Sequence, residues 1–373
     1  MPVLKPNSWL IQRLFLAALV IFAITGSAIS YAETLASEVQ RYAEQLLSDS
    51  VQSEGPGVVV LVANGDEVLY WGARGKASIE LSTPLLPDHV FRIGSISKQF
   101  TAAGLLKLVD AGRVSLDDSL SQYLPAYPNG KAIRLWQLLN HTSGIHDYYD
   151  LPGYLVSGRR RLEMDTLSLI DLFKNESTYF APGTAFRYTN SNYVLLAAVI
   201  EAATGKPWDA YLGESIGKPL GLAHTGYGSD RQVIPGLVQG YGYTDAGKLH
   251  RSAPNSMSQV IGGGALFSTA YDLWRWSRAL HGGRVLSQQS YYRMTTPEGA
   301  AKAEGYGYGL DCSNLNGEQV FRHNGLIFGF SSAVIYAPNS QLTVVTLSNS
   351  DSGSVKPSVM AEKLMAVARR ATP

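Results

Sequence analysis

The chain has 373 residues, of which 45% are hydrophobic and 16% are charged, and its formal net charge at pH 7 is +1. This length and composition indicate a globular chain with a sizeable core, either one large domain or two interlocked ones. The nearly balanced charge gives no strong field for nucleic acid or an anionic membrane surface, so we expect no nucleic-acid partner.

Residues 1–32 have the pattern of a signal peptide. Lys5 and Arg13 form a positive segment, an uncharged apolar run follows from Leu14 to Ser30, and Ser30-Tyr31-Ala32 supplies small residues for cleavage. The run is short for a membrane span, so we expect cleavage after Ala32 and a periplasmic or secreted protein with no stable membrane span. Retention of the segment as an N-terminal anchor is the alternative.

The first part of the mature chain is predicted to form a helix, a hairpin and a second helix. Their expected ranges are Glu33–Asp49, Val58–Ala63 paired with Val68–Trp71, and Gln99–Ala111. The turn signal Asn64-Gly65-Asp66 lies between the two apolar runs and predicts the hairpin. Gly112 marks the end of the second helix.

The middle of the chain is predicted to be mostly helical, and the end to return to strands. Helices are expected over Ile133–Asn140, Thr166–Lys174, Val194–Ala203, Ala270–Leu280 and Val359–Arg370, and late strands over Val320–Phe330, Ser331–Tyr336 and Leu342–Ser348. Early and late strands around a helical middle predict an α+β fold, with an antiparallel sheet flanked by the terminal helices. The expected domain of residues 33–373 has a discontinuous α/β part, about 33–115 and 257–373, and an inserted helical part, about 116–256.

Ser95 and Lys98 form the pattern S-x-x-K at the start of the second predicted helix. If Ser95 opens that helix, Lys98 lies nearly one turn further on the same face, so its amine can lie beside the serine hydroxyl. A lysine can take the serine proton where burial or nearby positive charge lowers its pKa. The N–H groups at the helix start also favour the anion that forms when a carbonyl is attacked. Alone the pattern is weak, because an N-capping serine with a solvated lysine matches it as well.

Other catalytic classes have less support in the sequence. An α/β-hydrolase would need a G-x-S-x-G elbow between a strand and a helix, and we do not expect its Ser-His-Asp triad here. No H-E-x-x-H motif or cysteine pair occurs, so we expect no catalytic metal and no cofactor, and His141 is interpreted as a structural loop residue. The single cysteine, Cys312, is expected to be a small core residue.

Two later motifs give the S-x-x-K pattern its meaning. Tyr188-Thr189-Asn190 and His323-Asn324-Gly325 follow it in the order that resembles the serine β-lactamase and penicillin-binding protein superfamily, in particular the class C β-lactamase, D-Ala-D-Ala carboxypeptidase and family VIII esterase branch. The resemblance covers nearly the whole mature chain and implies a β-lactamase/transpeptidase-like fold. It also includes Leu138-Leu139-Asn140-His141-Thr142-Ser143-Gly144, Pro182-Gly183, Gly262-Gly263-Gly264 and Gly325 followed by Gly329-Phe330-x-Ser.

The resemblance assigns expected roles to seven residues. It implies that Ser95 forms an acyl-enzyme, that Lys98 is its proton partner and that Tyr188 is a second acid/base. Tyr188 would need a nearby cation to act as a phenolate, and Lys98 is the candidate. The other four, Asn190, His323, Gly325 and Leu326, are expected to bind substrate. The side chain of Asn190 would hydrogen-bond an amide or ester side chain of the substrate, and His323 stands at the start of the third motif. Gly325 would let the substrate lie against the strand edge, and the N–H of Leu326 would join that of Ser95 around the oxyanion.

The third motif departs from the Lys-Thr-Gly triad of most β-lactamases. His323 replaces the lysine and Asn324 replaces the threonine, and a histidine is mostly neutral at pH 7. We therefore do not expect efficient β-lactam hydrolysis. Arg322 could restore some positive charge, but alternation along a strand points its side chain to the other face.

The predicted function is that of a secreted serine hydrolase with a Ser95 acyl-enzyme. The expected partner is a small-molecule or peptide substrate, and the favoured substrates are D-Ala-ended peptides, as in cell-wall peptide, or related amides. The alternatives are a carboxylesterase of the same fold that cleaves small esters, a β-lactamase, and a non-catalytic penicillin-binding receptor.

Overall fold

The computed structural model describes residues 35–156 and 158–370. The predicted signal peptide, residues 1–32, lies outside the described residues, so export stays a prediction. None of the described helices is both long and apolar enough to cross a bilayer. The predicted division into an α/β part and an inserted helical part also stays a prediction.

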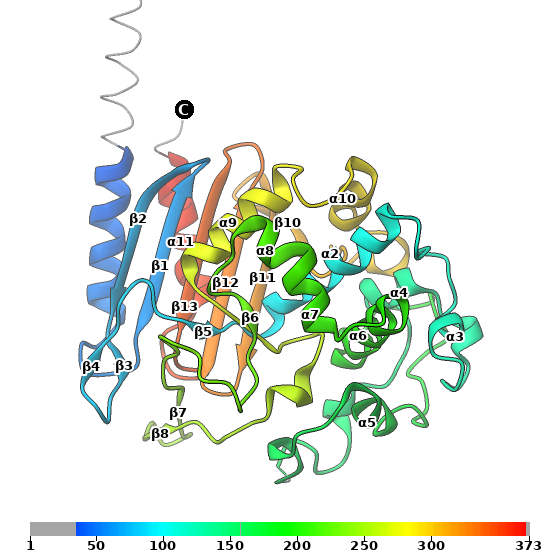
Figure 1. Cartoon of the computed structure of the whole chain (residues 1–373). Coiled ribbons are helices and arrows are strands. Elements are labelled where there is room, and N and C mark those ends of the chain that lie inside the picture. Colours follow the sequence, from blue (N-terminus) through cyan, green and yellow to red (C-terminus); the bar gives the residue numbers. More distant parts are fainter. Residues whose placement is uncertain (1–34, 157, 371–373) are drawn as a thin grey trace, which may run out of the picture.

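An antiparallel sheet organises the chain (Figure 1). Within the described residues it has six strands, in the order β10 (Asp311–Leu315), β11 (Glu318–Ile327), β12 (Phe330–Ala337), β13 (Leu342–Ser348), β1 (Val58–Asn64) and β2 (Glu67–Arg74). Every neighbouring pair is antiparallel. The predicted α+β fold class is therefore confirmed, and β1, the first of the described strands, lies inside the sheet between β2 and the last of them, β13.

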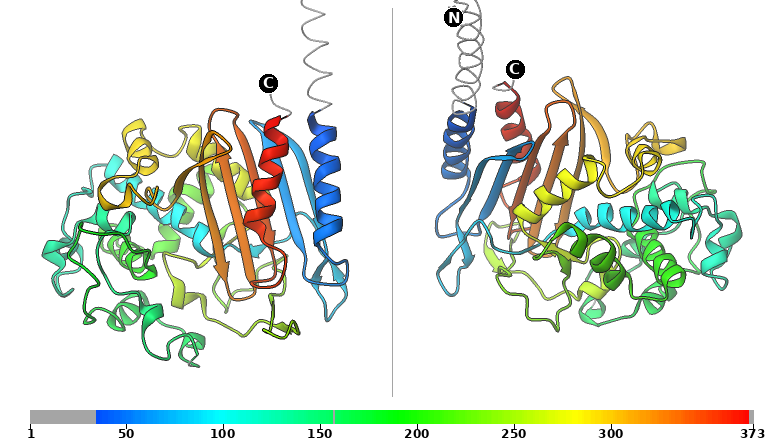
Figure 2. Two further views of the ribbon diagram at one scale, coloured as in Figure 1. Left: turned by 180° about the vertical axis from the view of Figure 1, so that it is seen from behind. Right: turned by 45° about the horizontal axis from the view of Figure 1, so that its top comes forward.

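Both faces of the sheet are covered, which explains the continuous apolar sequence of β1. Val58, Val60 and Val62 pack beneath the N-terminal helix, residues 35–50, and α11 (Pro357–Arg370). Figure 2 shows these two helices side by side on one face. The alternate residues of β1, such as Leu61, belong to the core on the opposite face. Alternation along a strand therefore buries apolar side chains in both directions.

A second group of helices extends the molecule away from the sheet. The 3₁₀ turn η1 (Gly94–Ile96) lies against β11 and continues into α2 (Ser97–Asp110), which packs against α6 (Asn190–Thr204). The other helices are α3 (Leu120–Tyr123), α4 (Leu135–Leu139), α5 (Thr166–Asp171), α7 (Trp208–Leu212), α8 (Lys218–Leu220), α9 (Ala270–His281) and α10 (Gln288–Thr295). The short strands are β3 (Lys76–Ser78), β4 (Thr83–Pro84), β5 (Phe91–Arg92), β6 (Gly226–Tyr227), β7 (Tyr241–Tyr243), β8 (Leu249–Arg251) and β9 (Leu266–Ser268).

Most element boundaries differ from the prediction by a few residues, and three of the differences have a clear local cause. The helix α2 begins at Ser97 rather than Gln99, because η1 leads directly into it. The helix α6 begins at Asn190 rather than Val194, because the Thr189 side chain caps it by accepting the N–H of Ser191 at 3.2 Å. The strand predicted over Val320–Phe330 instead ends at Ile327, since Gly329 turns the chain with φ +81°.

Candidate active site

Ser95 and Lys98 lie side by side where η1 continues into α2. The Nζ atom of Lys98 is 3.2 Å from the Oγ atom of Ser95. The lysine is 0% exposed, whereas the serine is partly exposed. The arrangement predicted from the S-x-x-K spacing is therefore present, with the nucleophile open to solvent and its base behind it.

Lys98 has two further partners that keep its amine in place. Its Nζ atom is 3.0 Å from the Oδ1 atom of Asn190 and 2.9 Å from the carbonyl oxygen of Gly263. Burial lowers the pKa of Lys98 to about 7. In its neutral form the amine still donates to these two acceptors, and its lone pair is left for the Ser95 proton.

The glycine triplet at residues 262–264 brings the Gly263 carbonyl to Lys98. Gly262 has φ +72°, and a Cβ atom there would lie 2.0 Å from the carbonyl oxygen of Tyr193, so only glycine fits. The hydroxyl of Thr101 on α2 donates to the Gly262 carbonyl at 2.6 Å. The Ser97 hydroxyl accepts the N–H of Leu266 at 3.1 Å. The segment is thus fixed to the helix that carries Lys98.

Tyr188 completes the group around the nucleophile. The Ser95 side chain lies near its hydroxyl, and the Lys98 Nζ atom lies 4.8 Å from the centre of its ring. Burial raises the pKa of Tyr188 above its ordinary value, away from neutrality, and the Ser95 side chain lowers it only in part. The lysine therefore does not make Tyr188 a phenolate near pH 7: Tyr188 is a neutral hydroxyl, and the group with a pKa near neutrality is Lys98.

His323 is held as a neutral imidazole. Its Nδ1 atom is 2.7 Å from the Asn324 carbonyl, which can only accept, so Nδ1 carries the proton. The Tyr306 hydroxyl then donates to Nε2 at 3.0 Å. Burial, aided by the charge of Lys98, lowers the pKa of His323 to about 4. The neutral state expected from the sequence is confirmed, but the sequence motifs did not indicate Tyr306 as its partner.

The strand β11 passes directly beside the nucleophile. A Cβ atom on Gly325 would lie 2.0 Å from the Ile93 carbonyl oxygen, so glycine permits this approach. One on Gly94 would lie 2.9 Å from the amide nitrogen of Leu326, which shows how close that amide is to η1. The Leu326 side chain is 65% exposed. The two amides expected at the oxyanion, those of Ser95 and Leu326, therefore belong to segments in contact.

Five of the seven predicted residues line one cavity of about 430 Å³, and the other two, Lys98 and Asn190, lie behind Ser95. The described residues that line it are Ser95, Phe186, Tyr188, Glu304, Tyr306, Asp311, Arg322, His323, Asn324, Gly325 and Leu326. Sequence reasoning did not single out Glu304 or Asp311. The structure thus brings the predicted site together and adds acidic side chains to its wall.

Arg322 does not replace the missing lysine charge. Its guanidinium pairs with Asp311 at 3.3 Å and with Glu362 of α11 at 2.8 Å. The side chain therefore reaches the α11 face of the sheet, as alternation predicted, and its charge is neutralised by two carboxylates.

Other catalytic architectures have no support in the part of the chain that the structure describes. The stretch Gly213–Gly217 matches G-x-S-x-G, but it forms a turn of π-helix after α7 instead of a strand-to-helix elbow. Within residues 35–156 and 158–370, no group of three or more His, Cys, Asp or Glu side chains could hold a metal ion. Cys312 is partly buried, and burial raises the pKa of its thiol to about 12.

Comparison with known proteins agrees with this geometry. The family model described as Beta-lactamase matches residues 39–369. The chain belongs to the Beta-lactamase family. It is a serine hydrolase of β-lactamase fold.

Relatives within the Beta-lactamase family include penicillin-binding proteins and D-specific hydrolases. The chain is 29% identical over 293 residues to the putative penicillin-binding protein PbpX of Bacillus subtilis, covering 79% of this chain and 70% of that protein. It is 30% identical over 318 residues to a D-aminopeptidase of Brucella anthropi, covering 84% of this chain but only 59% of the aminopeptidase. A crystal structure of a D-stereospecific amidohydrolase from Streptomyces sp. matches with a TM-score of 0.73 and 30% identity, covering 83% of this chain and 94% of the other.

Proposed function

We propose that the chain is an exported serine amidohydrolase that cleaves small amides or short peptides of D-amino acids through a Ser95 acyl-enzyme. The observation that carries the proposal is the buried Lys98 amine, 3.2 Å from the Ser95 Oγ atom and with its pKa lowered to about 7. The D-aminopeptidase and the D-stereospecific amidohydrolase among the relatives support the class of substrate. The signal-peptide pattern of residues 1–32 supports export.

In the proposed reaction, neutral Lys98 takes the Ser95 proton while Oγ attacks the amide carbon. The negative charge on the carbonyl oxygen is held by the N–H groups of Ser95 and Leu326. A proton passes through the Tyr188 hydroxyl to the leaving amine, the C–N bond breaks, and the acyl group stays on Ser95. Water then attacks the ester, gives up a proton along the same groups, and releases the carboxylic acid with Ser95 restored.

Replacing Tyr188 with phenylalanine tests the protonation of the leaving group. Amide hydrolysis should fall by about 10²-fold, because an amine leaves only with a proton. Hydrolysis of a p-nitrophenyl ester should fall much less, since p-nitrophenolate leaves without one. The measurement is kcat/KM for both substrates with the same enzyme preparation. Equal losses on the two substrates would contradict this role, and so would unchanged amide hydrolysis.

The charges around the cavity favour a substrate that carries an ammonium group. Among the described residues that line it, Arg322 is the one guanidinium or ammonium, and it already pairs with two carboxylates. His323 is neutral at pH 7. Glu304 is exposed at the wall of the cavity. A D-amino acid amide with a free amino group suits this wall better than the carboxylate of a D-Ala-ended peptide or a β-lactam.

A substrate panel tests the proposed function. D-alanine amide, its L-enantiomer and its N-acetyl derivative are compared with diacetyl-Lys-D-Ala-D-Ala, nitrocefin and p-nitrophenyl butyrate, with intact-mass detection of a Ser95 adduct. We expect the free D-amide to be turned over best, and N-acetylation to reduce turnover. Release of D-Ala from diacetyl-Lys-D-Ala-D-Ala without hydrolysis of D-alanine amide would indicate a carboxypeptidase instead. Cleavage of p-nitrophenyl butyrate alone would indicate an esterase, and a Ser95 adduct without turnover would indicate a binding protein.

The variant Glu304→Gln tests the ammonium preference directly. Because this carboxylate is exposed and screened by solvent, its removal should lower kcat/KM for D-alanine amide by up to about tenfold. Hydrolysis of the neutral p-nitrophenyl butyrate by the same variant is the control and should stay near the wild-type value. A loss of equal size on both substrates would mean that the variant disturbs the site as a whole.

A further inference from the structure

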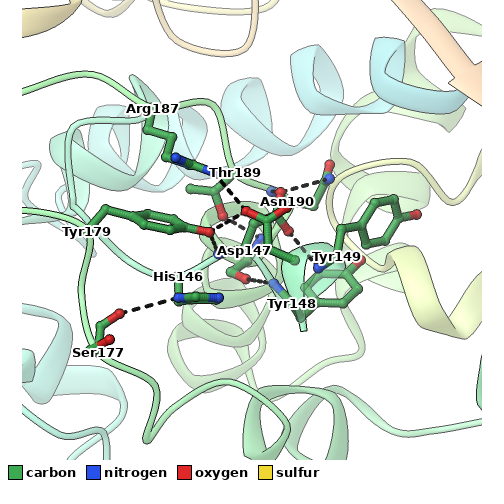
Figure 3. A network of polar contacts seen from close by, with 11 residues as sticks. His146, Asp147, Tyr148, Tyr149, Ser177, Tyr179, Arg187, Thr189 and Asn190 are labelled. Carbon is green, nitrogen blue, oxygen red and sulfur yellow. Dashed lines mark hydrogen bonds and ion pairs between the residues drawn. The ribbon is translucent and has the colours of Figure 1, made fainter. Parts of the chain in front are cut away.

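Asp147 is a buried carboxylate that the sequence reasoning did not single out. It is 8% exposed and lies just before the 3₁₀ turn η3 (Tyr148–Asp150), where its Oδ1 atom accepts the N–H of Tyr149 at 3.2 Å. Its own N–H donates to the Tyr179 hydroxyl at 3.2 Å. Figure 3 shows this side chain enclosed by the network, with Asn190 next to it. The contacts fix both the backbone and the carboxylate of Asp147.

The second carboxylate oxygen determines how the Asn190 amide is oriented. Oδ2 of Asp147 accepts the backbone N–H of Asn190 at 3.2 Å and faces its Nδ2 atom at 3.4 Å. The carboxylate can only accept, so it holds the NH₂ end of the amide. The Oδ1 atom of Asn190 is left facing Lys98 Nζ at 3.0 Å. If the amide were reversed, two donors would meet at Lys98 and two acceptors at Asp147.

The contacts also favour an ionised Asp147. Three N–H groups, one of Tyr149 and two of Asn190, point at its oxygens, and the described contacts include no acceptor for a carboxylic acid proton. Burial, aided by the charge of Asp150, raises the pKa of Asp147 above its ordinary value, while the backbone N–H groups of Tyr149 and Asn190 and the charge of Lys98 oppose that shift. The adjacent Asp150 is exposed and pairs with Arg187 at 2.8 Å.

Asp147 is the anion that acts on Lys98 among the described groups. The other titratable groups that face the lysine are Tyr188 and Tyr193, whose rings lie 4.8 and 5.4 Å from Nζ, and His141 and His323, whose pKa values burial lowers. Those that face Asp147 are Lys98, Asp150, Tyr148, Tyr149, Tyr154 and Tyr188. The tyrosines have raised pKa values, so all these rings are neutral near pH 7. The facing charges that remain are Lys98, Asp147 and the exposed carboxylate of Asp150, which is paired with Arg187.

We propose that Asp147 is a positioning residue for the Ser95–Lys98 pair. It acts through Asn190, by holding the amide so that Oδ1 faces the lysine, and it supplies the negative charge that balances the lysine across that amide. The inference rests on the proposed acylation of Ser95. It predicts that Asp147 sets the pH at which the enzyme becomes active, because acylation needs neutral Lys98 and a nearby carboxylate favours the charged form.

The experiment measures Ser95 acetylation by p-nitrophenyl acetate between about pH 5 and about pH 9, with intact mass as the readout. In Asp147→Asn, the acidic limb of the rate profile should move by about one unit to lower pH, because the variant removes the charge that favours protonated Lys98. The Asn amide oxygen can still accept from Tyr149 or Asn190. A merely structural role would lower the plateau and leave the limb in place.

Two further variants keep the test decisive. Asp147→Ser retains a side-chain acceptor for the Tyr149 N–H but carries no charge, so it should show the same shift if Asp147→Asn fails to fold. Asp165→Asn is the matched control: Asp165 also caps a helix, accepting the Ser168 N–H at 2.7 Å, but it lies on the surface at the start of α5. It should leave the limb unmoved.

The outcomes separate the two proposals. No adduct on the wild-type enzyme would overturn the proposed function. A wild-type adduct whose acidic limb stays in place in folded Asp147→Asn or Asp147→Ser would overturn the role of Asp147 alone. A shift of the same size in Asp165→Asn would also overturn it, because the effect would then come from loss of a helix cap.

Discussion

Replacing Ser95 with alanine is expected to abolish the acyl-enzyme and to lower hydrolysis of every substrate by about 10⁴-fold or more. The Oγ atom is the partly exposed nucleophile beside Lys98 and Tyr188, and alanine removes it without filling space. The measurement is intact mass after incubation with p-nitrophenyl acetate, together with steady-state rates on an amide.

Ser97→Ala is the matched control for this loss. Ser97 lies two residues further on, but its hydroxyl accepts the N–H of Leu266 at 3.1 Å, and Ser97 does not line the cavity. The control variant should still form the adduct. If Ser95→Ala retained an adduct, or if Ser97→Ala lost it while remaining folded, the nucleophile would have been assigned wrongly.

Replacing Lys98 should produce the second largest loss, about 10³-fold in acylation. Lys98→Met keeps much of the buried volume but has no amine, and Lys98→Arg keeps a positive charge that is never given up. Both variants should lose Ser95 acylation, because the proposed role needs a neutral amine that can accept a proton. In the wild-type enzyme, acylation should rise as the pH increases through about 7, where Lys98 loses its proton.

The comparison of the two lysine variants distinguishes a base from a fixed charge. If Lys98→Arg retained most of the activity, positive charge alone would be sufficient and the role of base would be wrong. If the wild-type rate showed no acidic limb near neutral pH, the lowered pKa of Lys98 would have no part in acylation. The acidic limb of the pH profile of acylation should also disappear in both lysine variants when they are measured over the same pH range.

Local sequence signals predicted much of the fold correctly. The hairpin β1–β2 follows from two apolar runs around Asn64-Gly65-Asp66, and α9 and β13 match their predicted ranges closely. The weaker predictions lie at boundaries. Side-chain capping by Thr189 started α6 earlier than its apolar pattern indicated, and the turn at Gly329 ended β11 earlier than predicted, so that Phe330 belongs to β12.

The motifs predicted which site residues come together. They did not predict the neighbouring groups that determine the protonation states of those residues. The spacing of Ser95 and Lys98 was sufficient to predict their contact, and His323 was correctly expected to be neutral. Asp147 and Tyr306 act through contacts with residues 43 and 17 positions away. The low accessibility that changes the pKa values of Lys98 and Tyr188 is likewise a property of the packed molecule.

The position of β1 has a consequence for how the chain folds. Every residue of β1, from Val58 to Asn64, pairs with β13, so these two inner strands of the sheet join segments almost 300 residues apart, such as Val58 and Ser348. Such distant pairing makes folding slow and leaves early segments without partners during synthesis. The edge of β1 that faces β13 therefore has no partner until the final segments of the chain emerge, and the sheet cannot close before then. An open chain is the form in which a polypeptide can be threaded through a narrow channel, so late closure of the sheet is compatible with transport before folding.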